Sequence, residues 1–247
     1  MDPSHIPIGN RFNNLKQIGS TNELAREWIL NGIARHGDVL FTLDQTAGRG
    51  QMGKSWQSEP GQNLAMTILL ENASLPDPIP FHLSVCCALA CRETLTPLTA
   101  GELSIKWPND LYWKKRKLGG LLIEKQSTWS LAGIGINVNQ RQFDPSLPNP
   151  VSVKQITGRE NDPASLSMTI VDNLNQLLHD WTQTGFAPLL EKYRSLLFGK
   201  GESFLVKENG KEKTIRIIDV DDQGALLIEE HQQQRAVVTG LEWMIVP

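Results

Sequence analysis

GRGQMGKSW, residues Gly48–Trp56, is the stretch of this chain that constrains its structure most. It follows VLFTL at 39–43, an apolar run that is typical of a β-strand. Glycine tolerates positive φ angles and lets a ligand approach the main chain, so three glycines in nine residues predict a loop that bends around a bound group. Arg49 and Lys54 supply positive charge, and Trp56 supplies an aromatic face. The sequence therefore predicts a loop that closes over a phosphate and an aromatic base.

The same stretch satisfies the P-loop spacing GxxxxGK[ST] between Gly48 and Ser55. A P-loop needs a helix directly after the motif, because the helix N-terminus helps to hold the phosphates. The residues that follow, QSEPG at 57–61, indicate a turn instead. A P-loop nucleotide switch and a flexible surface loop thus remain as alternatives. A helix that begins near Lys54 would support the first, and extended chain there would exclude it.

Composition limits the class of protein. The chain has 247 residues, of which 40% are hydrophobic and 21% charged, as in an ordinary globular protein with one large domain and room for a small one. A net charge of −3 and a pI of about 6.0 argue against a broad nucleic-acid surface. No apolar run approaches the ~20 residues of a membrane span, and the start, MDPSH, has no signal-peptide pattern. We expect a cytoplasmic protein without nucleic-acid or membrane partners.

The cysteines Cys86, Cys87 and Cys91 all lie in one apolar segment between residues 81 and 92. They form no C-x-x-C pattern and have no partner elsewhere in the chain. We therefore predict buried thiols on a helix rather than a metal site or a disulfide, which fits a reducing compartment.

Apolar periodicity predicts an α+β fold. Ser20 and Glu23 have the spacing of a capping box and predict a helix that ends at Asn31–Gly32. Further helices are expected at 81–94, 163–181 and 186–197, and strands at 39–44, 63–70, 103–107 and 128–137. Residues 111–113 and 117–125 predict a hairpin with a charged turn at 114–116. After the boundary signal FGKG at 198–201 the pattern changes to short β segments, expected at 203–207, 214–220, 225–229, 236–239 and 241–246. These predict a small β-barrel of SH3 size.

The second segment that indicates chemistry is KWPND, Lys106–Asp110. Lys106 lies inside an apolar strand, where an ammonium group is costly to bury without an anionic partner. The alternative is an alternating strand in which Lys106 faces water, with Asn109 and Asp110 forming only a turn. Asp110 is also a candidate magnesium ligand, since Mg²⁺ usually takes one carboxylate together with substrate phosphates.

Two further segments combine glycine with polar residues: KLGG at Lys117–Gly120 and GIGINVN at Gly133–Asn139. Paired glycines beside Lys117 allow a ligand to lie against the backbone while the lysine meets its charged end, although a hairpin with a bulge explains them too. The five histidines are scattered, and no Ser-His-Asp arrangement is visible. This pattern favours charge stabilisation of a phosphate or acyl-phosphate over covalent catalysis.

The four segments, with STN at Ser20–Asn22, resemble biotin–protein ligases in order and spacing from about residue 15 to the C-terminus. The resemblance implies a catalytic domain at 1–198 with a mixed β-sheet and helices, of the class II synthetase and biotin ligase kind, and an SH3-like domain at 199–247. It implies an enzyme that uses Mg²⁺ and ATP to form biotinyl-5′-AMP and then biotinylates a lysine of a biotin carboxyl carrier protein domain. The alternatives are a lipoate–protein ligase or related acyltransferase on the same fold, and a non-enzymatic biotin- or nucleotide-binding module.

The resemblance also assigns residues to roles. The candidates for binding biotin are Ser20, Thr21, Asn22, Gln45, Arg49, Gly50, Gln51, Lys117, Gly120 and Gly135. The candidates for binding ATP and the adenylate are Arg49, Trp56, Lys106, Asn109, Lys117 and Asn137, with Trp56 over the adenine and Asn137 at its edge. The catalytic candidates are Arg49, Lys106 and Lys117, and the metal candidate is Asp110.

The chain departs from the family pattern in the glycine loop. Many relatives carry two further arginines there, where this chain has Gln51 and Met52, so we expect a less charged loop. The repressor branch of the family has an N-terminal helix-turn-helix domain, and residues 1–19 are too few for one, so we expect ligase activity without operator binding. A homodimer is compatible with the sequence.

Overall fold

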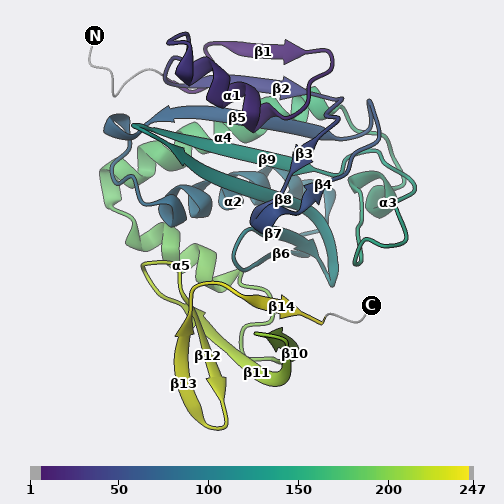
Figure 1. The fold of residues 1–247 in the computed structure, drawn as a ribbon, viewed down its shortest axis with the longest axis vertical. Coiled ribbons are helices and arrows are strands. Elements are labelled where there is room, and N and C mark those ends of the chain that lie inside the picture. Colours follow the sequence, from purple (N-terminus) through teal and green to yellow (C-terminus); the bar gives the residue numbers. More distant parts are fainter. Residues whose placement is uncertain (1–6, 245–247) are drawn as a thin grey trace.

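A seven-stranded mixed β-sheet forms the centre of the larger part of the molecule in the computed structural model, which describes residues 7–244 (Figure 1). The strand order is β1-β2-β5-β9-β8-β7-β6. The strands are β1 (Phe12–Leu15), β2 (Asp38–Thr42), β5 (Leu64–Glu71), β6 (Leu103–Lys106), β7 (Asp110–Trp113), β8 (Arg116–Gln126) and β9 (Trp129–Ile136). Only β1 and β2 pair in parallel, and the other neighbours are antiparallel. The mixed sheet predicted from the sequence is confirmed.

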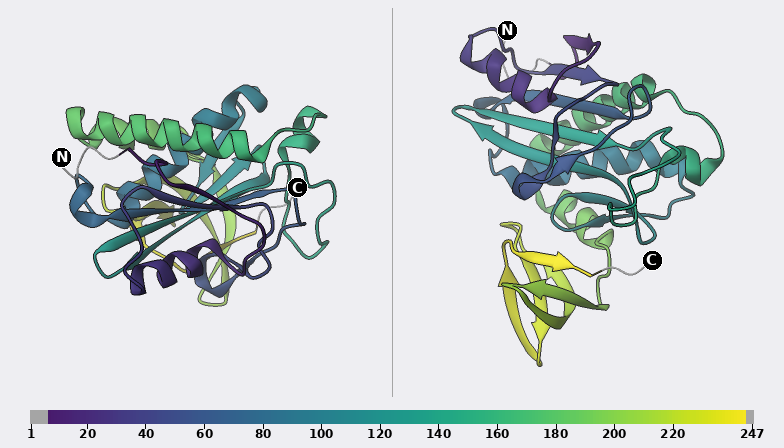
Figure 2. Two further views of the ribbon diagram at one scale, coloured as in Figure 1. Left: turned by 90° about the horizontal axis from the view of Figure 1, so that it is seen from above. Right: turned by 45° about the vertical axis from the view of Figure 1, so that its right-hand side comes forward.

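Helices cover both faces of this sheet. On one face α1 (Thr21–Leu30) packs Ala25 against Leu40, Leu69 and Leu131. On the opposite face lie α2 (Pro80–Leu95) and α4 (Pro163–Thr184), which pack against each other, and α4 also contacts β5 (Figure 2, left). Because both faces of β5 are covered, its first seven residues are all buried, as is usual for a strand between two layers.

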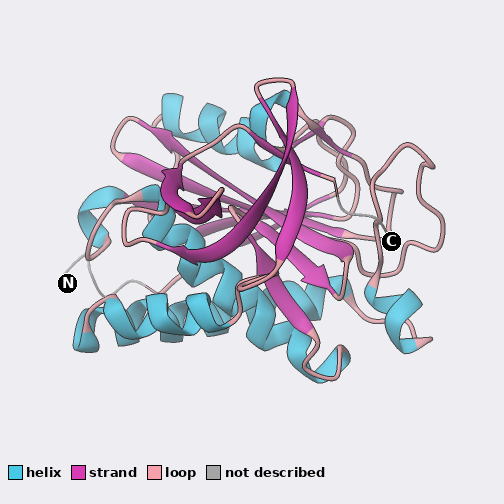
Figure 3. Ribbon diagram, turned by 90° about the horizontal axis from the view of Figure 1, so that it is seen from below, coloured by secondary structure: helices cyan, strands magenta, loops and turns pink. Residues whose placement is uncertain are grey.

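The helix α2 is buried almost all round, since the sheet, α4 and α5 all pack against it. Its three cysteines are buried and free, as predicted, and burial raises the pKa of each thiol above its ordinary value. Two shorter helices complete the α elements, α3 (Val153–Thr157) and α5 (Ala187–Ser195), and Figure 3 shows the helices grouped around the strands.

A second, five-stranded antiparallel sheet follows α5 (Figure 1). Its strands are β10 (Ser203–Glu208), β11 (Lys211–Val220), β12 (Leu226–Glu230), β13 (Gln233–Val237) and β14 (Leu241–Trp243), in the order β13-β12-β11-β10-β14. Alternate residues such as Val206, Ile217 and Ile228 point into its core. This is the small SH3-like β domain predicted from the sequence, although residues 245 and 246 of the last predicted strand lie outside the described part.

The predicted capping box at the start of α1 is wrong. Ser20 is the N-cap residue, but its side chain makes no capping hydrogen bond. Instead, Gln45 accepts the Thr21 N–H through Oε1 at 2.9 Å, and Glu23 pairs with Arg49. The hydroxyl of Ser20 is therefore not committed to the helix.

The elements that were not predicted include the strand β1 and the helix α3. The strand β1, FNNL, has two polar residues in four and owes its strand conformation to parallel pairing with β2. The helix α3 does begin with a capping box, in which Ser152 and Gln155 each bond to the other's backbone. The helix ends at its C-cap residue, Gly158, whose φ of 73° is a left-handed conformation that favours glycine.

The glycine loop contains no α-helix. Gly48–Arg49 (β3) pairs with Ser55–Trp56 (β4), and a single 3₁₀ turn, Gln51–Gly53 (η2), joins the two. The chain after Lys54 is extended, which removes the P-loop alternative. Over residues 7–244, no helix is both long and apolar enough to cross a membrane.

Candidate active site

One cleft of about 720 Å³ lies between the large sheet, the glycine loop and the edge of the small sheet. It brings together every site residue predicted from the sequence: Ser20, Thr21, Asn22, Gln45, Arg49, Gly50, Gln51, Trp56, Lys106, Asn109, Asp110, Lys117, Gly120, Gly135 and Asn137. These residues come from segments up to 117 positions apart in the chain, Ser20 to Asn137 (137 − 20 = 117). The cations Arg49, Lys106 and Lys117 therefore share one cleft and do not lie on unrelated faces of the molecule.

A network of buried polar groups fixes the orientation of Asn22. Its Nδ2 donates to Glu124 Oε2 at 2.8 Å, and its Oδ1 accepts the hydroxyl of Thr67 at 2.5 Å. A Cβ at Gly133 would lie 2.4 Å from Asn22 Oδ1, so only glycine leaves room for this amide. These contacts fix the side-chain amide of Asn22 at the end of the cleft that Ser20 and Thr21 also line. Neither Thr67 nor Glu124 was predicted as part of the site.

Lys106 is the buried cation of the cleft, with only 8% of its surface exposed. Its Nζ lies 5.5 Å from the ring centre of Tyr112 and 4.7 Å from that of Trp243. Burial lowers the pKa of Lys106 to about 8, with the nearby charge of Asp110 opposing that shift. The alternative in which Lys106 simply faces water is therefore wrong.

Lys117 and Asp110 form an ion pair, with Nζ and Oδ1 2.7 Å apart. The register of β7 and β8 shifts by one residue between Leu111 and Tyr112, so Asp110 lies opposite Gly120 rather than Gly119. A Cβ at Gly120 would lie 3.2 Å from Asp110 Oδ1 and 3.5 Å from Lys117 Nζ. The absent side chain at Gly120 leaves this pair open to the cleft, and the bulge that was only one explanation of the KLGG segment is real.

Arg49 lies at the rim, with 47% of its side chain exposed. Its guanidinium pairs with Glu23 on α1 and lies 3.9 Å from Glu124, so it faces the same carboxylate that binds Asn22. A rim arginine on a loop with few buried contacts can exchange these partners for a bound anion at modest cost.

Trp56 lies against the floor of the cleft. A Cβ at Gly135 would lie 2.7 Å from Trp56 Cε2, and Lys117 Nζ is 5.9 Å from the Trp56 ring centre. The Trp56 Nε1 is buried, and no described residue accepts its hydrogen bond. An aromatic ring held on a glycine, with an unused donor, is suited to contact a bound planar group.

Two predicted nucleotide contacts are partly committed to the fold. Asn137 Nδ2 donates to Val151 O at 3.1 Å, which leaves its Oδ1 as the atom available to a ligand. Asn109 donates its side-chain amide to Leu121 O, and the Leu121 N–H returns to Asn109 O at 2.9 Å. This reciprocal pairing holds the KWPND turn against β8.

The donor set allows a magnesium ion only together with a substrate. In the described range 7–244, no group of three or more His, Cys, Asp and Glu side chains could hold a metal. Asp110 offers one carboxylate, already paired with Lys117. Mg²⁺ commonly binds through one or two carboxylates and the phosphates of a nucleotide, so Asp110 fits such a site once a nucleotide is present.

Sequence reasoning missed one whole wall of the cleft, which the small domain supplies. Its residues 238–243 line the cleft, and so does the loop 147–150 of the larger part. Val238 to Trp243 read only as the end of a small barrel in the sequence, and no spacing connects them to Lys106. Tertiary packing alone brings them there.

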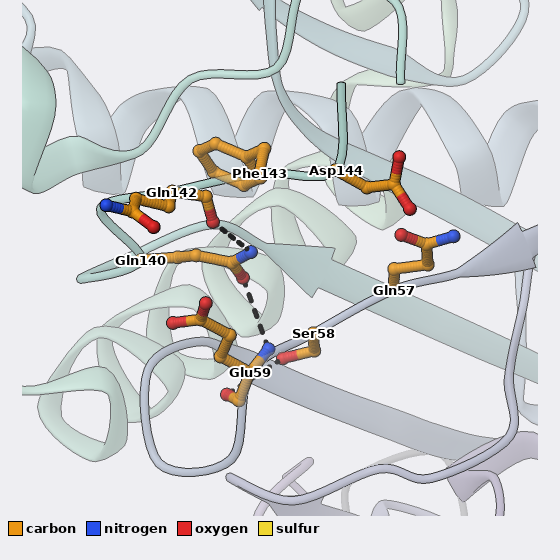
Figure 4. A pocket seen from close by; sticks show the side chains of 7 residues that line it. All are labelled: Gln57, Ser58, Glu59, Gln140, Gln142, Phe143 and Asp144. Carbon is orange, nitrogen blue, oxygen red and sulfur yellow. Dashed lines mark hydrogen bonds between the residues drawn. The ribbon is translucent and has the colours of Figure 1, made fainter. Parts of the chain in front are cut away.

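A second, smaller hollow of about 340 Å³ lies beside the cleft (Figure 4). Gln140 spans it, accepting the Glu59 N–H at 3.2 Å and donating to Gln142 O at 2.8 Å. Its lining residues are Gln57, Ser58, Glu59, Gln140, Gln142, Phe143 and Asp144. They include no lysine or arginine, so this hollow does not match the anionic ligand that the cleft suits.

Comparisons with known proteins agree with this geometry. The model of the Biotin/lipoate A/B protein ligase family matches residues 15–140. The bifunctional ligase/repressor BirA of Escherichia coli is 32% identical over 227 residues, covering 87% of this chain and 68% of that protein. The biotin–[acetyl-CoA-carboxylase] ligase of Mycobacterium tuberculosis is 27% identical over 217 residues, covering 86% and 81%.

Solved structures give the same result for the whole fold. A biotin protein ligase from Aquifex aeolicus, solved in complex with biotin and ATP, superposes with a TM-score of 0.82 and 26% identity. The match covers 95% of this chain and 98% of that one, and so includes both sheets.

Proposed function

Because this chain belongs to the biotin/lipoate A/B protein ligase family, we propose that the cleft described above performs its chemistry: ATP-dependent transfer of biotin to a carrier protein. The chain is a biotin–protein ligase, and its carrier is the biotin-accepting protein of a carboxylase. We further propose that the accepting group is one lysine of a biotin carboxyl carrier protein domain. The observation that carries the site assignment is the convergence of Arg49, Lys106 and Lys117 on one cleft.

In the first step, a carboxylate oxygen of biotin attacks the α-phosphorus of ATP. The bond from that phosphorus to the bridging oxygen breaks, and pyrophosphate leaves, so that biotinyl-5′-AMP remains. Two anions have to meet, which makes positioned cations the main requirement. In our proposal Lys117 meets the biotin carboxylate and Lys106 the phosphate, while Arg49 leaves Glu23 to cover both.

Biotin binds at the polar end of the cleft in this proposal. Its ureido ring is a neutral group with both donors and acceptors, and it lies against Ser20, Thr21, Asn22 and Gln45. The hydroxyl of Ser20 makes no capping bond and is free to contribute. The amide of Asn22 is fixed by Thr67 and Glu124, so no side-chain reorganisation is required when the ring binds.

The adenine occupies the neighbouring region, next to Trp56 and the Oδ1 of Asn137. Asp110 would hold Mg²⁺ together with the ATP phosphates, and the ion would neutralise charge on the leaving pyrophosphate. Closure of the glycine loop, Gly48–Trp56, keeps water away from the mixed anhydride until the carrier arrives.

In the second step, the amine of the carrier lysine attacks the acyl carbon of biotinyl-5′-AMP. The bond from that carbon to the phosphate oxygen breaks, the amine loses a proton, and AMP leaves. The product is an amide bond between biotin and the lysine. No residue of the ligase becomes covalently attached at either step, which agrees with a site that has cations but no activated nucleophile.

The first test is isotope exchange between ATP and pyrophosphate, which reports adenylate formation alone. We expect exchange that depends on biotin and not on lipoate, and mass spectrometry should then show one biotin added to a carrier domain. Lys106→Ala and Lys117→Ala should each lose most of the exchange, while the exposed Lys125→Ala, on β8, should not. Exchange that depends on lipoate, or binding of biotin without exchange, would contradict the proposed activity. Wild-type rates in both cleft variants would contradict only the roles of the two lysines.

A further inference from the structure

The small domain reaches the buried lysine of the cleft through Trp243, a residue of its last described strand, β14. The Trp243 ring centre lies 4.7 Å from Lys106 Nζ, closer than that of Tyr112 at 5.5 Å. The two rings come from different sheets and contact the same ammonium group. Both residues line the cleft, so this contact lies where the nucleotide would bind.

We infer that Trp243 is a positioning residue for the adenylation step: it acts through Lys106, holding the ammonium group of that lysine on its aromatic face and aiming it at the phosphate. The inference rests on the proposed function and assigns the C-terminal domain a residue in the reaction centre. Its ligand class is the anionic phosphate of a nucleotide, bound by Lys106 and not by the tryptophan itself.

The charges around Lys106 explain why it needs such a partner. Lys106 has no ion-pair partner among the described residues, since the nearby Asp110 is paired with Lys117 at 2.7 Å. Lys54 and Lys117 add positive charge close by. A buried ammonium among other cations is held poorly by charge alone, and the negative face of an aromatic ring attracts a desolvated cation. The face of Trp243 therefore replaces a counter-ion while leaving the positive charge of Lys106 unneutralised for the phosphate.

Packing fixes the ring in this place. Trp243 lies 5.2 Å from Phe204 and 6.3 Å from Phe198, ring centre to ring centre, and its backbone pairs with Val206 on β10. Its Nε1 is buried and has no acceptor among the described residues. The ring is thus held by aromatic packing and by the cation, and not by a hydrogen bond of its own.

The small domain is itself docked on the large one at several points. Trp107 Nε1 donates to Gly224 O at 2.9 Å, directly beside Lys106 in the chain. Arg194 Nε donates to Val220 O at 2.7 Å. Thr239, next to β14, contacts Met52 at the tip of the glycine loop. The position of Trp243 over Lys106 is therefore set by a docked domain and not by a free terminus.

The test compares Trp243→Phe, which keeps an aromatic face, with Trp243→Leu, which keeps apolar volume without one. We expect Trp243→Leu to lower kcat/KM for ATP in pyrophosphate exchange about 3- to 10-fold, in line with a desolvated cation–π contact. Trp243→Phe should retain at least about half of the wild-type value, and the biotin Kd should change less than about twofold in both. Leu205→Ala, exposed on β10 of the same sheet, is the matched control and should leave kcat/KM unchanged.

A double-mutant cycle separates positioning from mere folding. The affinity for a non-hydrolysable analogue of biotinyl-5′-AMP is measured in wild type, Trp243→Leu, Lys106→Met and the double variant. The tryptophan substitution should weaken binding only when Lys106 is present. Equal losses in Phe and Leu variants, or an unchanged effect in the Lys106→Met background, would overturn the inference. Pyrophosphate exchange by the wild type is measured alongside, so failure of the ligase proposal would be seen separately.

Discussion

Lys106 is a residue that lowers the stability of the ligand-free protein and is proposed to bind the phosphate during adenylate formation. An ammonium group that is 8% exposed loses most of its hydration, and the rings of Tyr112 and Trp243 replace only part of it. This burial lowers the pKa of Lys106 from the ordinary value of 10.5 to about 8. A phosphate in the cleft would reverse it, because an opposite charge favours the protonated lysine.

Lys106→Met is therefore predicted to stabilise the ligand-free protein while removing adenylate formation. In the unfolded chain the lysine binds a proton up to about pH 10.5, but in the folded protein only up to about pH 8. The penalty is fully present below pH 8, about 3 kcal/mol at most, and it disappears as pH rises towards 10.5. We expect a gain of about 1–3 kcal/mol in the free energy of unfolding at pH 7, measured by denaturant titration, that shrinks to under about 1 kcal/mol at pH 10.

The control for that measurement is Lys125→Met, a like-for-like change at an exposed position on β8. It should alter stability by less than about 0.5 kcal/mol at either pH, as most surface substitutions do. A Lys106→Met variant that is less stable than wild type at pH 7 would show that packing, and not desolvation, dominates at this position.

Among the elements, the glycine loop is the one whose chemistry differs most from the pattern that it resembles. Its 3₁₀ turn places Met52 at φ 54° with 65% of its surface exposed, and Gln51 lines the cleft beside it. Two uncharged residues thus occupy the tip of a loop that should cover a phosphate. A pair of opposite charges at a partly exposed site stabilises a complex only modestly, by about 0.2–1 kcal/mol.

We predict that the double change Gln51→Arg and Met52→Arg slows dissociation of biotinyl-5′-AMP about two- to tenfold. The added cations attract the adenylate phosphate, and the backbone of the turn can stay as it is because arginine replaces a residue with the same stereochemistry. Stopped-flow release of the adenylate measures the rate. At 0.5 M salt the difference should largely vanish, since exposed charges are screened. A difference that persists in high salt would indicate packing against Thr239 instead.

The main elements could be predicted because their patterns are local. The buried run of β5, the amphipathic α4 and the turn between β7 and β8 each carry the spacing of their own secondary structure. The strand β1 could not be predicted, since its polar FNNL sequence becomes a strand only through pairing with β2. The capping box at Ser20 was wrongly predicted because the spacing of Ser20 and Glu23 does not show which group binds the first N–H of the helix, and here the side chain of Gln45 accepts it.

The site was predictable wherever a glycine or a buried charge had to be explained. Lys106 and Gly120 are unusual for the strands that carry them, and both line the cleft. Thr67 and Trp243 give no such signal, because a threonine or a tryptophan in a strand is ordinary. Their roles depend on contacts across 45 and 137 residues of sequence, with Asn22 (67 − 22 = 45) and Lys106 (243 − 106 = 137) respectively. Spacing within one segment contains no information about such contacts.

At the scale of the whole molecule, the two sheets share one continuous hydrophobic core. Leu197 at the end of the large part and Val206, Ile217 and Ile228 of the small sheet all belong to the same cluster of buried side chains as the interior of the large sheet. Hydrogen bonds such as that from Trp107 to Gly224 cross the junction as well. The domain boundary between residues 198 and 199 thus remains a prediction from the sequence. The shared core indicates that the two parts unfold as one cooperative unit.

This continuity predicts that the protein unfolds in a single thermal transition. A cavity in the core of the small sheet should therefore lower the stability of the whole molecule. Ile228 is fully buried in β12, away from the cleft, and Ile228→Ala should cost about 2–4 kcal/mol of stability. Differential scanning calorimetry should show one peak that moves to lower temperature as a whole, and Leu205→Ala, half exposed in the same sheet, should hardly move it. A non-hydrolysable biotinyl-5′-AMP analogue should raise the transition temperature of wild type and variant alike, because residues of both sheets line the cleft that it occupies. Two separate peaks, with only one shifted by Ile228→Ala, would mean that the small domain folds independently and that its contact with Lys106 is made after folding.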